Sequence, residues 1–259
     1  METSSLQVVL VQADLHWEDA PANRAHLSQL LANISAPADI IVLPEMFTTG
    51  FTMAPDRLAE PTQGPTLAWM QQWARQLDAV VTGSLIVFAD GQYFNRLLWV
   101  RPDGTYRHYD KRHLFSLAGE HRHYAQGQER LVETWRGWRV MPLICYDLRF
   151  PVWSRNDLGY DLLLYVANWP DRRGAAWRAL LTARAIENQA YTIGLNRVGH
   201  DGNDVYYAGD SCLIDFLGQP LAHLSAREQW QRVSLDRDAL NSFRERYRFL
   251  ADQDSFLIQ

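Results

Sequence analysis

The sequence predicts a layered α/β fold, and three observations support this prediction. Short apolar runs of strand length alternate with helix-like segments along the whole chain. One of these runs, Asp39–Glu45, is uninterrupted until Pro44, which is typical of a strand buried on both faces. Neither a linker composition nor a repeat of fixed period divides the chain. We therefore expect one domain over residues 1–259, built from packed layers of helices and sheets.

The N-terminal half contains several strand signals and two helix signals. Leu27, Leu30 and Leu31 lie on one face of the first expected helix, and Pro65 stands near the first turn of the second. An Asp90-Gly91 pair marks a hairpin turn, and Asp103-Gly104 opens a further strand. We expect strands at Leu6–Gln12, Asp39–Glu45, Ala79–Phe88 and Gln92–Arg101, and helices at Asn23–Asn33 and Thr66–Leu77.

The C-terminal half begins after a long polar segment, Asp110–Gln128, which is rich in His, Arg and Gly. A loop of this length inside a compact domain is usually functional or disordered. Gly218 predicts a turn, and the chain ends on the apolar residues Phe256–Ile258. We expect strands at Trp138–Ile144, Asp161–Ala167, Tyr191–Val198 and Asp210–Phe216, and helices at Ala175–Gln189 and Arg237–Leu250.

The composition argues against several classes of protein. There are 25 basic and 30 acidic residues, giving a net charge of −5, so no basic surplus exists to bind nucleic acid. No apolar stretch approaches the ~20 residues of a membrane span, and the N-terminus does not resemble a secretory signal. Two cysteines are too few for a disulfide framework. We expect a reduced, cytoplasmic protein with free thiols and no membrane partner.

Cys145 is a candidate nucleophile because it ends an apolar strand and is followed at once by a polar turn. A thiol at such a turn is exposed to substrate, and the backbone N–H of Tyr146 would face the developing oxyanion. A free cysteine is more often a small buried hydrophobe, and the two interpretations are about equally supported. Cys212 lies inside an apolar run and is predicted to belong to the core.

Glu45 and Lys111 are candidate partners for such a nucleophile. Glu45 directly follows apolar residues, and partial burial would raise its pKa toward the range of a general base. Lys111 begins the long polar segment, where a buried ammonium could stabilise an oxyanion or a thiolate. Taken alone, each residue is better explained structurally, as a turn-capping carboxylate and as part of a solvated Lys111-Arg112 pair.

The histidines of the polar segment are weak evidence for a metal site. His121 and His123 alternate, but no carboxylate or cysteine pair at metal-ligand spacing accompanies them. A structural or surface role is favoured, and we expect no metal. Glu120 could instead support the catalytic group through a hydrogen bond. Neither a phosphate-binding loop nor a Gly-x-Ser-x-Gly elbow is present.

Taken together, these segments resemble the nitrilase superfamily of carbon–nitrogen hydrolases. The resemblance covers nearly the whole chain, and five strings in the same order make it specific. Within the superfamily, Pro44–Met53 is most similar to the omega-amidase subgroup. The five strings are Leu43–Phe47 (LPEMF), Asp110–Phe115 (DKRHLF), Ile144–Pro151 (ICYDLRFP), Ala167–Pro170 (ANWP) and Ala183–Tyr191 (ARAIENQAY).

The resemblance implies a four-layer αββα sandwich of two mixed sheets with helices outside. It also implies a catalytic triad of Glu45, Lys111 and Cys145, with Glu120 positioning the triad and no cofactor. The resemblance further implies a homodimer in which helices and the C-terminal tail pack across the two-fold axis. The alternative for the apolar tail of this chain is that it folds back on its own subunit.

The resemblance to omega-amidases also implies a substrate class, the monoamides of short dicarboxylic acids such as 2-oxoglutaramate or succinamate. The distal carboxylate of such a substrate needs a cation, which Arg172 or Arg173 could supply unless they form a solvated turn. Asp147 and Arg149 are expected to hold the loop after Cys145. The remaining candidate pocket residues are Asn168 and Trp169 at the mouth, by the same comparison, and Phe47, Phe51 and Phe115, each of which could equally be core.

Three alternative functions remain open. The same fold could hydrolyse a nitrile or an N-carbamoyl amine, and a substrate panel would separate these reactions from amide hydrolysis. A metal-dependent hydrolase would use the segment with His121 and His123 and would be sensitive to chelators. A non-catalytic binding protein is the third, although it would have no need of a buried Glu, Lys and Cys together.

Overall fold

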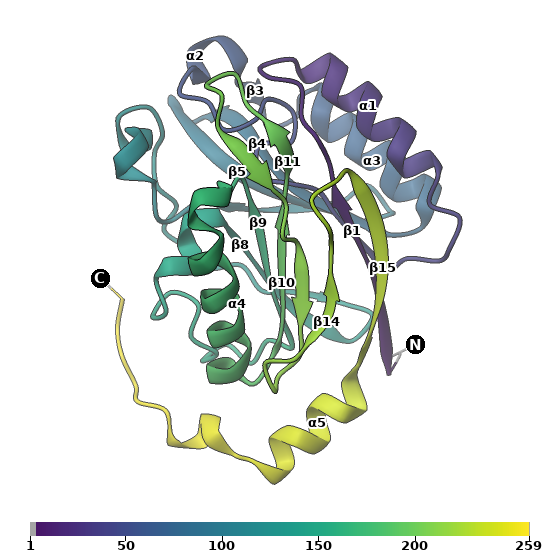
Figure 1. The fold of residues 1–259 in the computed structure, drawn as a ribbon, viewed down its shortest axis with the longest axis vertical. Helices are drawn as coiled ribbons and strands as arrows, with labels where there is room; N and C mark the ends of the chain where they lie inside the picture. The colour runs from purple at the N-terminus through teal and green to yellow at the C-terminus, as the bar shows by residue number, and fades with distance from the viewer. Residues whose placement is uncertain (1–3, 259) are drawn as a thin grey trace.

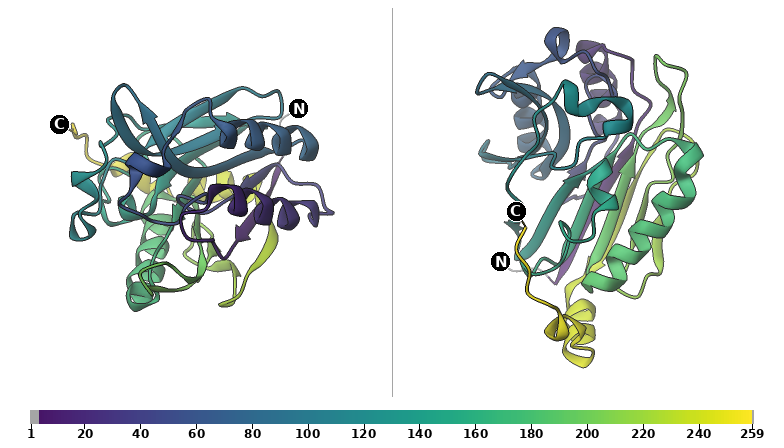
Figure 2. Two further views of the ribbon diagram at one scale, coloured as in Figure 1. Left: turned by 90° about the horizontal axis from the view of Figure 1, so that it is seen from above. Right: turned by 90° about the vertical axis from the view of Figure 1, so that its left-hand side faces the viewer.

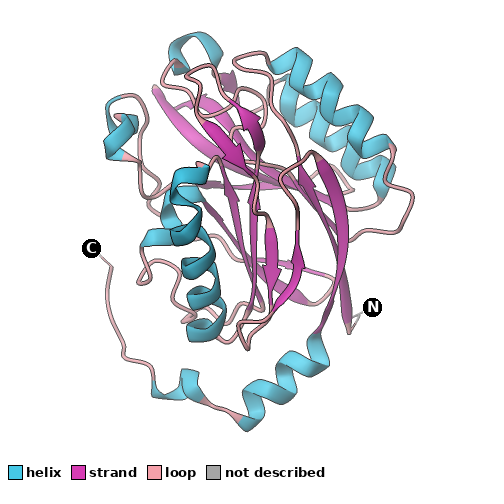
Figure 3. Ribbon diagram, in the orientation of Figure 1, coloured by secondary structure: helices cyan, strands magenta, loops and turns pink. Residues whose placement is uncertain are grey.

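The computed structural model describes residues 4–258 and contains two large mixed β-sheets with helices on their outer faces (Figures 1 and 3). A small third sheet forms a hairpin. The first sheet has the order β15 (Gln229–Asp236), β1 (Ser5–Gln12), β2 (Ile40–Val42), β4 (Val80–Ala89), β5 (Gln92–Val100) and β6 (Tyr106–Asp110), and β3 (Glu60–Pro61) pairs with β4. The second sheet has the order β14 (Pro220–His223), β13 (Cys212–Ile214), β10 (Tyr191–Asn196), β9 (Leu162–Ala167), β8 (Trp138–Ile144) and β7 (Glu133–Trp135). The hairpin consists of β11 (Val198–His200) and β12 (Tyr206–Ala208).

Parallel strands form the centre of each large sheet. In the first sheet β2 pairs in parallel with β1 and β4, and in the second β9 pairs in parallel with β8 and β10. The other strands pair antiparallel, except for the short β3, which pairs in parallel with β4. The central strands are apolar runs because both of their faces are covered. Since neighbouring parallel strands end at the same edge of a sheet, residues that follow β2, β8 and β9 are brought close together.

The helices cover the outer face of each sheet, which gives four layers (Figure 2). Helices α1 (Ala20–Ala32) and α3 (Pro65–Leu77) pack on the first sheet, and α4 (Gly174–Asn188) packs on the second. Alternating side chains of β1 show this arrangement, because Val9 belongs to the core beneath α1 and α3 whereas Val8 belongs to the core between the sheets. The four layers confirm the expected αββα sandwich.

Several elements differ from the sequence-based expectation. The strand expected over Asp39–Glu45 ends at Val42, and the C-terminal helix α5 (Arg237–Arg246) stops before Leu250 and is followed by the 3₁₀ helix η5 (Phe249–Asp252). The long polar segment is an ordered loop with two 3₁₀ turns, η1 (Ser116–Ala118) and η2 (Glu120–Arg122). The elements that the sequence did not indicate are α2 (Pro55–Leu58), β3, β7, β11, β12, β14 and β15.

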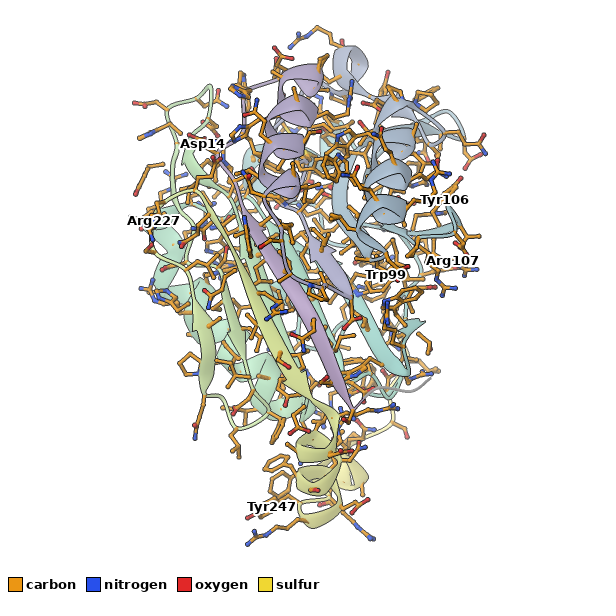
Figure 4. The ribbon with its side chains drawn as sticks, turned by 90° about the vertical axis from the view of Figure 1, so that its right-hand side faces the viewer. Asp14, Trp99, Tyr106, Arg107, Arg227 and Tyr247 are labelled. Carbon is orange, nitrogen blue, oxygen red and sulfur yellow. The ribbon has the colours of Figure 1, made fainter. Side chains whose placement is uncertain are left out.

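Helix α5 lies at the far end of the molecule from the end of β1, as the labels Tyr247 and Asp14 show in Figure 4. After α5 the chain turns and runs back along the outside of the molecule (Figure 1), and the side chain of Leu257 is 94% exposed. The apolar tail therefore does not fold back into the core of its own subunit, and the homodimer stays a prediction. Within residues 4–258, no helix combines the length and apolar character needed to cross a membrane.

Candidate active site

A cavity of about 560 Å³ opens where the central parallel strands end. Its wall includes Lys111 after β6, Cys145 after β8 and Asn168 after β9. The hairpin β11–β12 contributes Tyr207 to the opposite wall. The volume is in the range of small-molecule sites, and the position at the carboxyl ends of parallel strands is typical of α/β enzymes.

Cys145 occupies the sharp turn that the sequence indicated. It is the first residue of the 3₁₀ helix η3 (Cys145–Arg149) and has a φ angle of +43°, a left-handed conformation that is uncommon for a residue with a side chain. Its thiol is 4.0 Å from the backbone oxygen of Asn168. The surrounding structure holds a strained backbone at this position, as is common where a side chain must be aimed at a ligand.

Glu45 is fully buried and its carboxylate accepts hydrogen bonds at both oxygens. Oε1 accepts from Lys111 Nζ at 2.8 Å and from Asn95 Nδ2 at 2.8 Å. Oε2 accepts from the backbone N–H of Asn168 at 2.8 Å. The side-chain amide of Asn168 also donates to the backbone oxygen of Glu45, at 2.7 Å. These bonds fix the carboxylate beside the thiol of Cys145.

Lys111 lies between two carboxylates. Its Nζ donates to Glu45 at 2.8 Å and to both oxygens of Glu120 at 3.0 Å, so its three protons all have acceptors. Burial alone would lower the pKa of Lys111, but Glu120 and Glu45 outweigh burial and raise it. The ammonium is therefore charged and rigidly placed, with its Nζ 5.1 Å from the ring centre of Phe51.

The thiol of Cys145 is protonated in the resting site. Burial raises its pKa well above the ordinary value, Glu45 raises it further, and Lys111 opposes both. Burial likewise raises the pKa of Glu120, against the opposing effect of Lys111. A nucleophilic sulfur at this position thus requires a base that removes the proton during attack, and the Glu45 carboxylate is the adjacent acceptor.

The three predicted triad residues therefore converge beside one cavity. The sequence model of the carbon–nitrogen hydrolase family matches residues 7–245 of this chain. The chain belongs to the carbon–nitrogen hydrolase family. This confirms the resemblance to the nitrilase superfamily.

The sequence of this hydrolase aligns over most of its length with those of several known proteins. It is 49% identical to Omega-amidase YafV of Yersinia enterocolitica, over 98% of this chain and 99% of that protein. It is 33% identical to the 2-oxoglutaramate amidase of Bacillus subtilis, over 87% of this chain and 89% of that protein. A crystal structure of a CN-hydrolase superfamily protein from Xanthomonas campestris, with an arsenic adduct in its active site, has a TM-score of 0.97. Its sequence identity is 45%, with 99% of this chain and 100% of that chain covered.

Asp147 ties the two sides of the hydrolase site together, as the prediction that it holds the loop requires. Its Oδ2 accepts from the hydroxyl of Tyr109 at 2.7 Å and from the backbone N–H of Ile144 at 3.0 Å. Its Oδ1 is 2.9 Å from the backbone nitrogen and 2.8 Å from Nδ1 of His113. The segment around Lys111 and the turn at Cys145 are thus joined through one buried carboxylate.

Asn95 is a site residue that the sequence reasoning missed. It is buried in β5, where its Oδ1 accepts from Ser84 Oγ at 2.8 Å while its amide donates to Glu45. Ser84 Oγ in turn accepts from the backbone N–H of Met46 at 2.9 Å. The signal was available, because an amide side chain in the middle of a predicted strand requires a polar partner when it is buried.

The structure places most predicted pocket residues at the cavity but corrects two expectations. Phe47 packs in the core against Trp69, with ring centres 5.8 Å apart, and does not line the cavity. Arg149, expected to hold the loop, lines the cavity with its guanidinium 5.0 Å from the ring centre of Trp169. The predicted residues that do line it are Phe51, Phe115, Tyr146, Asn168, Trp169, Arg172 and Arg173.

His121 and His123 are exposed on the loop and do not line the cavity. Over residues 4–258, the structure brings no three His, Cys, Asp or Glu side chains into an arrangement that could hold a metal ion. Within these residues the structure therefore offers no set of ligands to the alternative of a metal-dependent hydrolase.

Proposed function

We propose that this carbon–nitrogen hydrolase is an omega-amidase, which converts small dicarboxylic acid monoamides such as 2-oxoglutaramate and succinamate into the acid and ammonia. One observation carries the proposal. Lys111 donates a hydrogen bond to Glu45, and Lys111 and Cys145 line the same cavity. The names of the two relatives, Omega-amidase YafV and 2-oxoglutaramate amidase, support this choice of substrates.

In the first half of the reaction Cys145 is the nucleophile and Glu45 is the general base. Glu45 takes the thiol proton as sulfur attacks the carbonyl carbon of the amide, because the raised pKa of Cys145 keeps the resting thiol protonated. The carbonyl electron pair moves to oxygen and forms a tetrahedral oxyanion. When the C–N bond breaks, the protonated Glu45 transfers its proton to the leaving nitrogen. Ammonia departs and a thioester remains on Cys145.

The oxyanion is stabilised by the backbone N–H of Tyr146 and by the charge of Lys111. Tyr146 lies at the start of η3, where backbone N–H groups have no partner within the helix. Lys111 already donates to Glu45 and Glu120, so its contribution comes from its fixed positive charge and from donors that it shares with the oxyanion. Glu120 is a positioning residue, because it holds Lys111 and does not itself line the cavity.

In the second half of the reaction, the same groups hydrolyse the thioester. Glu45 removes a proton from water as the water oxygen attacks the thioester carbon. The C–S bond breaks, the acid is released, and Glu45 returns its proton to the sulfur. Every proton that leaves one group is received by another group of the site, so the cycle is balanced without a cofactor.

The test is ammonia release from 2-oxoglutaramate by the wild-type protein, by Cys145→Ala and by the matched control Cys212→Ala. Cys212 is buried in β13 and does not line the cavity. We expect Cys145→Ala to lower the rate on the order of a thousandfold or more, while Cys212→Ala keeps it. A loss of less than about tenfold in Cys145→Ala would refute the cysteine mechanism.

The same assay with a panel of amides, nitriles and N-carbamoyl amines tests the substrate class. We expect the dicarboxylic acid monoamides to have the highest kcat/KM. If wild-type protein releases no ammonia from any amide but cleaves a nitrile or an N-carbamoyl amine in a Cys145-dependent way, the nucleophile stands and the omega-amidase proposal fails.

A further inference from the structure

Three arginine side chains reach the cavity without a carboxylate partner. Arg149, Arg172 and Arg173 all line it, and none of their guanidinium groups forms an ion pair or a side-chain hydrogen bond with any residue in the 4–258 range. Arg173, the half-buried one of the three, differs in this from most other buried or half-buried arginines of this range, such as Arg96, which pairs with Asp110. Several unpaired cations around one cavity indicate that their partner is an anionic ligand.

Two of these arginines are held in place by aromatic rings. The guanidinium of Arg149 lies 5.0 Å from the ring centre of Trp169, and that of Arg173 lies 5.1 Å from the ring centre of Phe115. A guanidinium that contacts a ring leaves its N–H groups available for a planar anion. No such ring contact holds Arg172; Arg149 and Arg172 are both exposed, and Arg173 is half-buried. Arg149 and Arg173 are therefore each oriented by contact with an aromatic ring, and Arg172 is not.

Trp169 joins these two arginines. Its ring lies under Arg149, and its indole N–H donates to the backbone oxygen of Arg173 at 2.9 Å. Its own backbone N–H donates to Asn196 Oδ1 at 2.8 Å, which anchors it to the end of β10. One buried tryptophan thus contacts the guanidinium of Arg149 and holds the backbone of Arg173, and it is itself anchored to the second sheet.

The acidic residues that line the cavity are already engaged elsewhere. Glu18 binds the hydroxyl of Thr52 and forms an ion pair with Arg57. Asp201 accepts from the hydroxyl of Tyr207 at 2.9 Å and from backbone N–H groups of its own hairpin. Neither carboxylate is paired with the arginines of the cavity, so the positive charge of that wall is not neutralised.

We propose that Arg149 and Arg173, joined by Trp169, form the site that binds the distal carboxylate of the substrate. This inference rests on the proposed function for the identity of the reacting amide. In this proposal Arg149 helps to determine substrate specificity. Arg173 binds the carboxylate directly, whereas its neighbour Arg172 only attracts it over a longer distance. The ligand class is an amide whose other end is a carboxylate, because two guanidinium groups with free N–H groups match a planar anion.

The first test compares succinamate with 4-oxopentanamide, in which a neutral methyl ketone replaces the carboxylate at the same chain length. The variants are Arg149→Gln and Arg173→Gln, with Arg75→Gln as a control that removes an exposed charge from the outer face of α3. We expect each cavity variant to raise the KM for succinamate about ten- to hundredfold. Hydrolysis of 4-oxopentanamide should change by less than about threefold, and Arg75→Gln should change neither reaction.

The second test measures binding of succinate by calorimetry and does not depend on hydrolysis. We expect both cavity variants to weaken binding about ten- to hundredfold, and Arg172→Gln to weaken it less than either. The inference is overturned if Arg149→Gln and Arg173→Gln bind succinate as the wild type does, or if they lose both amides equally. If the arginines are needed for succinate but the wild type hydrolyses no amide, the carboxylate site stands and the proposed function fails.

Discussion

Replacing Asp147 by asparagine is expected to lower the free energy of unfolding by about 3–6 kcal/mol. The carboxylate is fully buried and accepts bonds from Tyr109, Ile144 and His113, two at each oxygen. An asparagine amide keeps only one of the two acceptor positions, so two donors lose their acceptor whichever way the amide is oriented. A hydrogen bond to a charged group contributes about 1.5–3 kcal/mol, and two such bonds give the stated range.

Urea denaturation followed by tryptophan fluorescence measures this change, with the midpoint and the slope compared between the two proteins. The control is Asp90→Asn, which makes the same chemical change at an exposed turn where asparagine tolerates the φ angle of +52°. We expect the control to alter stability by less than about 0.5 kcal/mol. If Asp147→Asn lowers stability by less than about 1 kcal/mol, the carboxylate does not join the two sides of the site as argued.

Three further predictions concern the proton acceptor, its support and the helix layer. Glu45→Gln should lower the hydrolysis rate on the order of a thousandfold. The same change should lower the pKa of Cys145, because Glu45 adds to the effect of burial in raising that pKa in the wild type. Alkylation of Cys145 by iodoacetamide should therefore begin at lower pH. An alkylation profile that is unchanged or shifted to higher pH would contradict this prediction. Asn95→Leu removes one hydrogen bond to the Glu45 carboxylate and should lower kcat about tenfold or more, and an unchanged kcat would show that this bond is dispensable. Gly194→Ala would place a Cβ 2.3 Å from Leu181 Cδ1. Thermal unfolding should therefore show that the free energy of unfolding falls by about 1–3 kcal/mol. A variant as stable as the wild type would mean that α4 can shift on β10 to make room.

The sequence predicted the central strands from a strong local pattern, whereas it predicted the triad through the family resemblance. Uninterrupted apolar runs mark strands covered on both faces, and the polar residues directly after them reach the edge where a site forms. Glu45 and Cys145 follow such runs, whereas Lys111 follows the polar strand β6, and the structure places all three residues together. The pairing of the sheets into four layers came from the family resemblance, since alternation of strands and helices alone is compatible with several layered folds.

The missed elements have weak or misleading patterns. Strand β15 is exposed or half-buried at every residue but Leu235, so its residues do not alternate clearly between apolar and polar. Hairpin β11–β12 encloses an Asp201-Gly202 pair, a turn signal that could have identified it. Arg149 could not be assigned to the cavity because its guanidinium is placed by Trp169, which is distant in the sequence. Phe47 was ambiguous because an aromatic side chain near a site can face the core or the ligand with the same local sequence.

The pairing of β1 with β15 has a consequence for synthesis of the protein in a cell. Ser5 pairs with Asp236, so one side of the N-terminal strand has no hydrogen-bond partner until almost the whole chain has been made. At ordinary translation speeds of about 5–20 residues per second, this interval is roughly twelve to forty-six seconds. During that time the strand exposes an open edge to other nascent chains, which favours aggregation. Recombinant yield should therefore depend on translation rate and on chaperones, and truncations that remove β15 should yield insoluble protein.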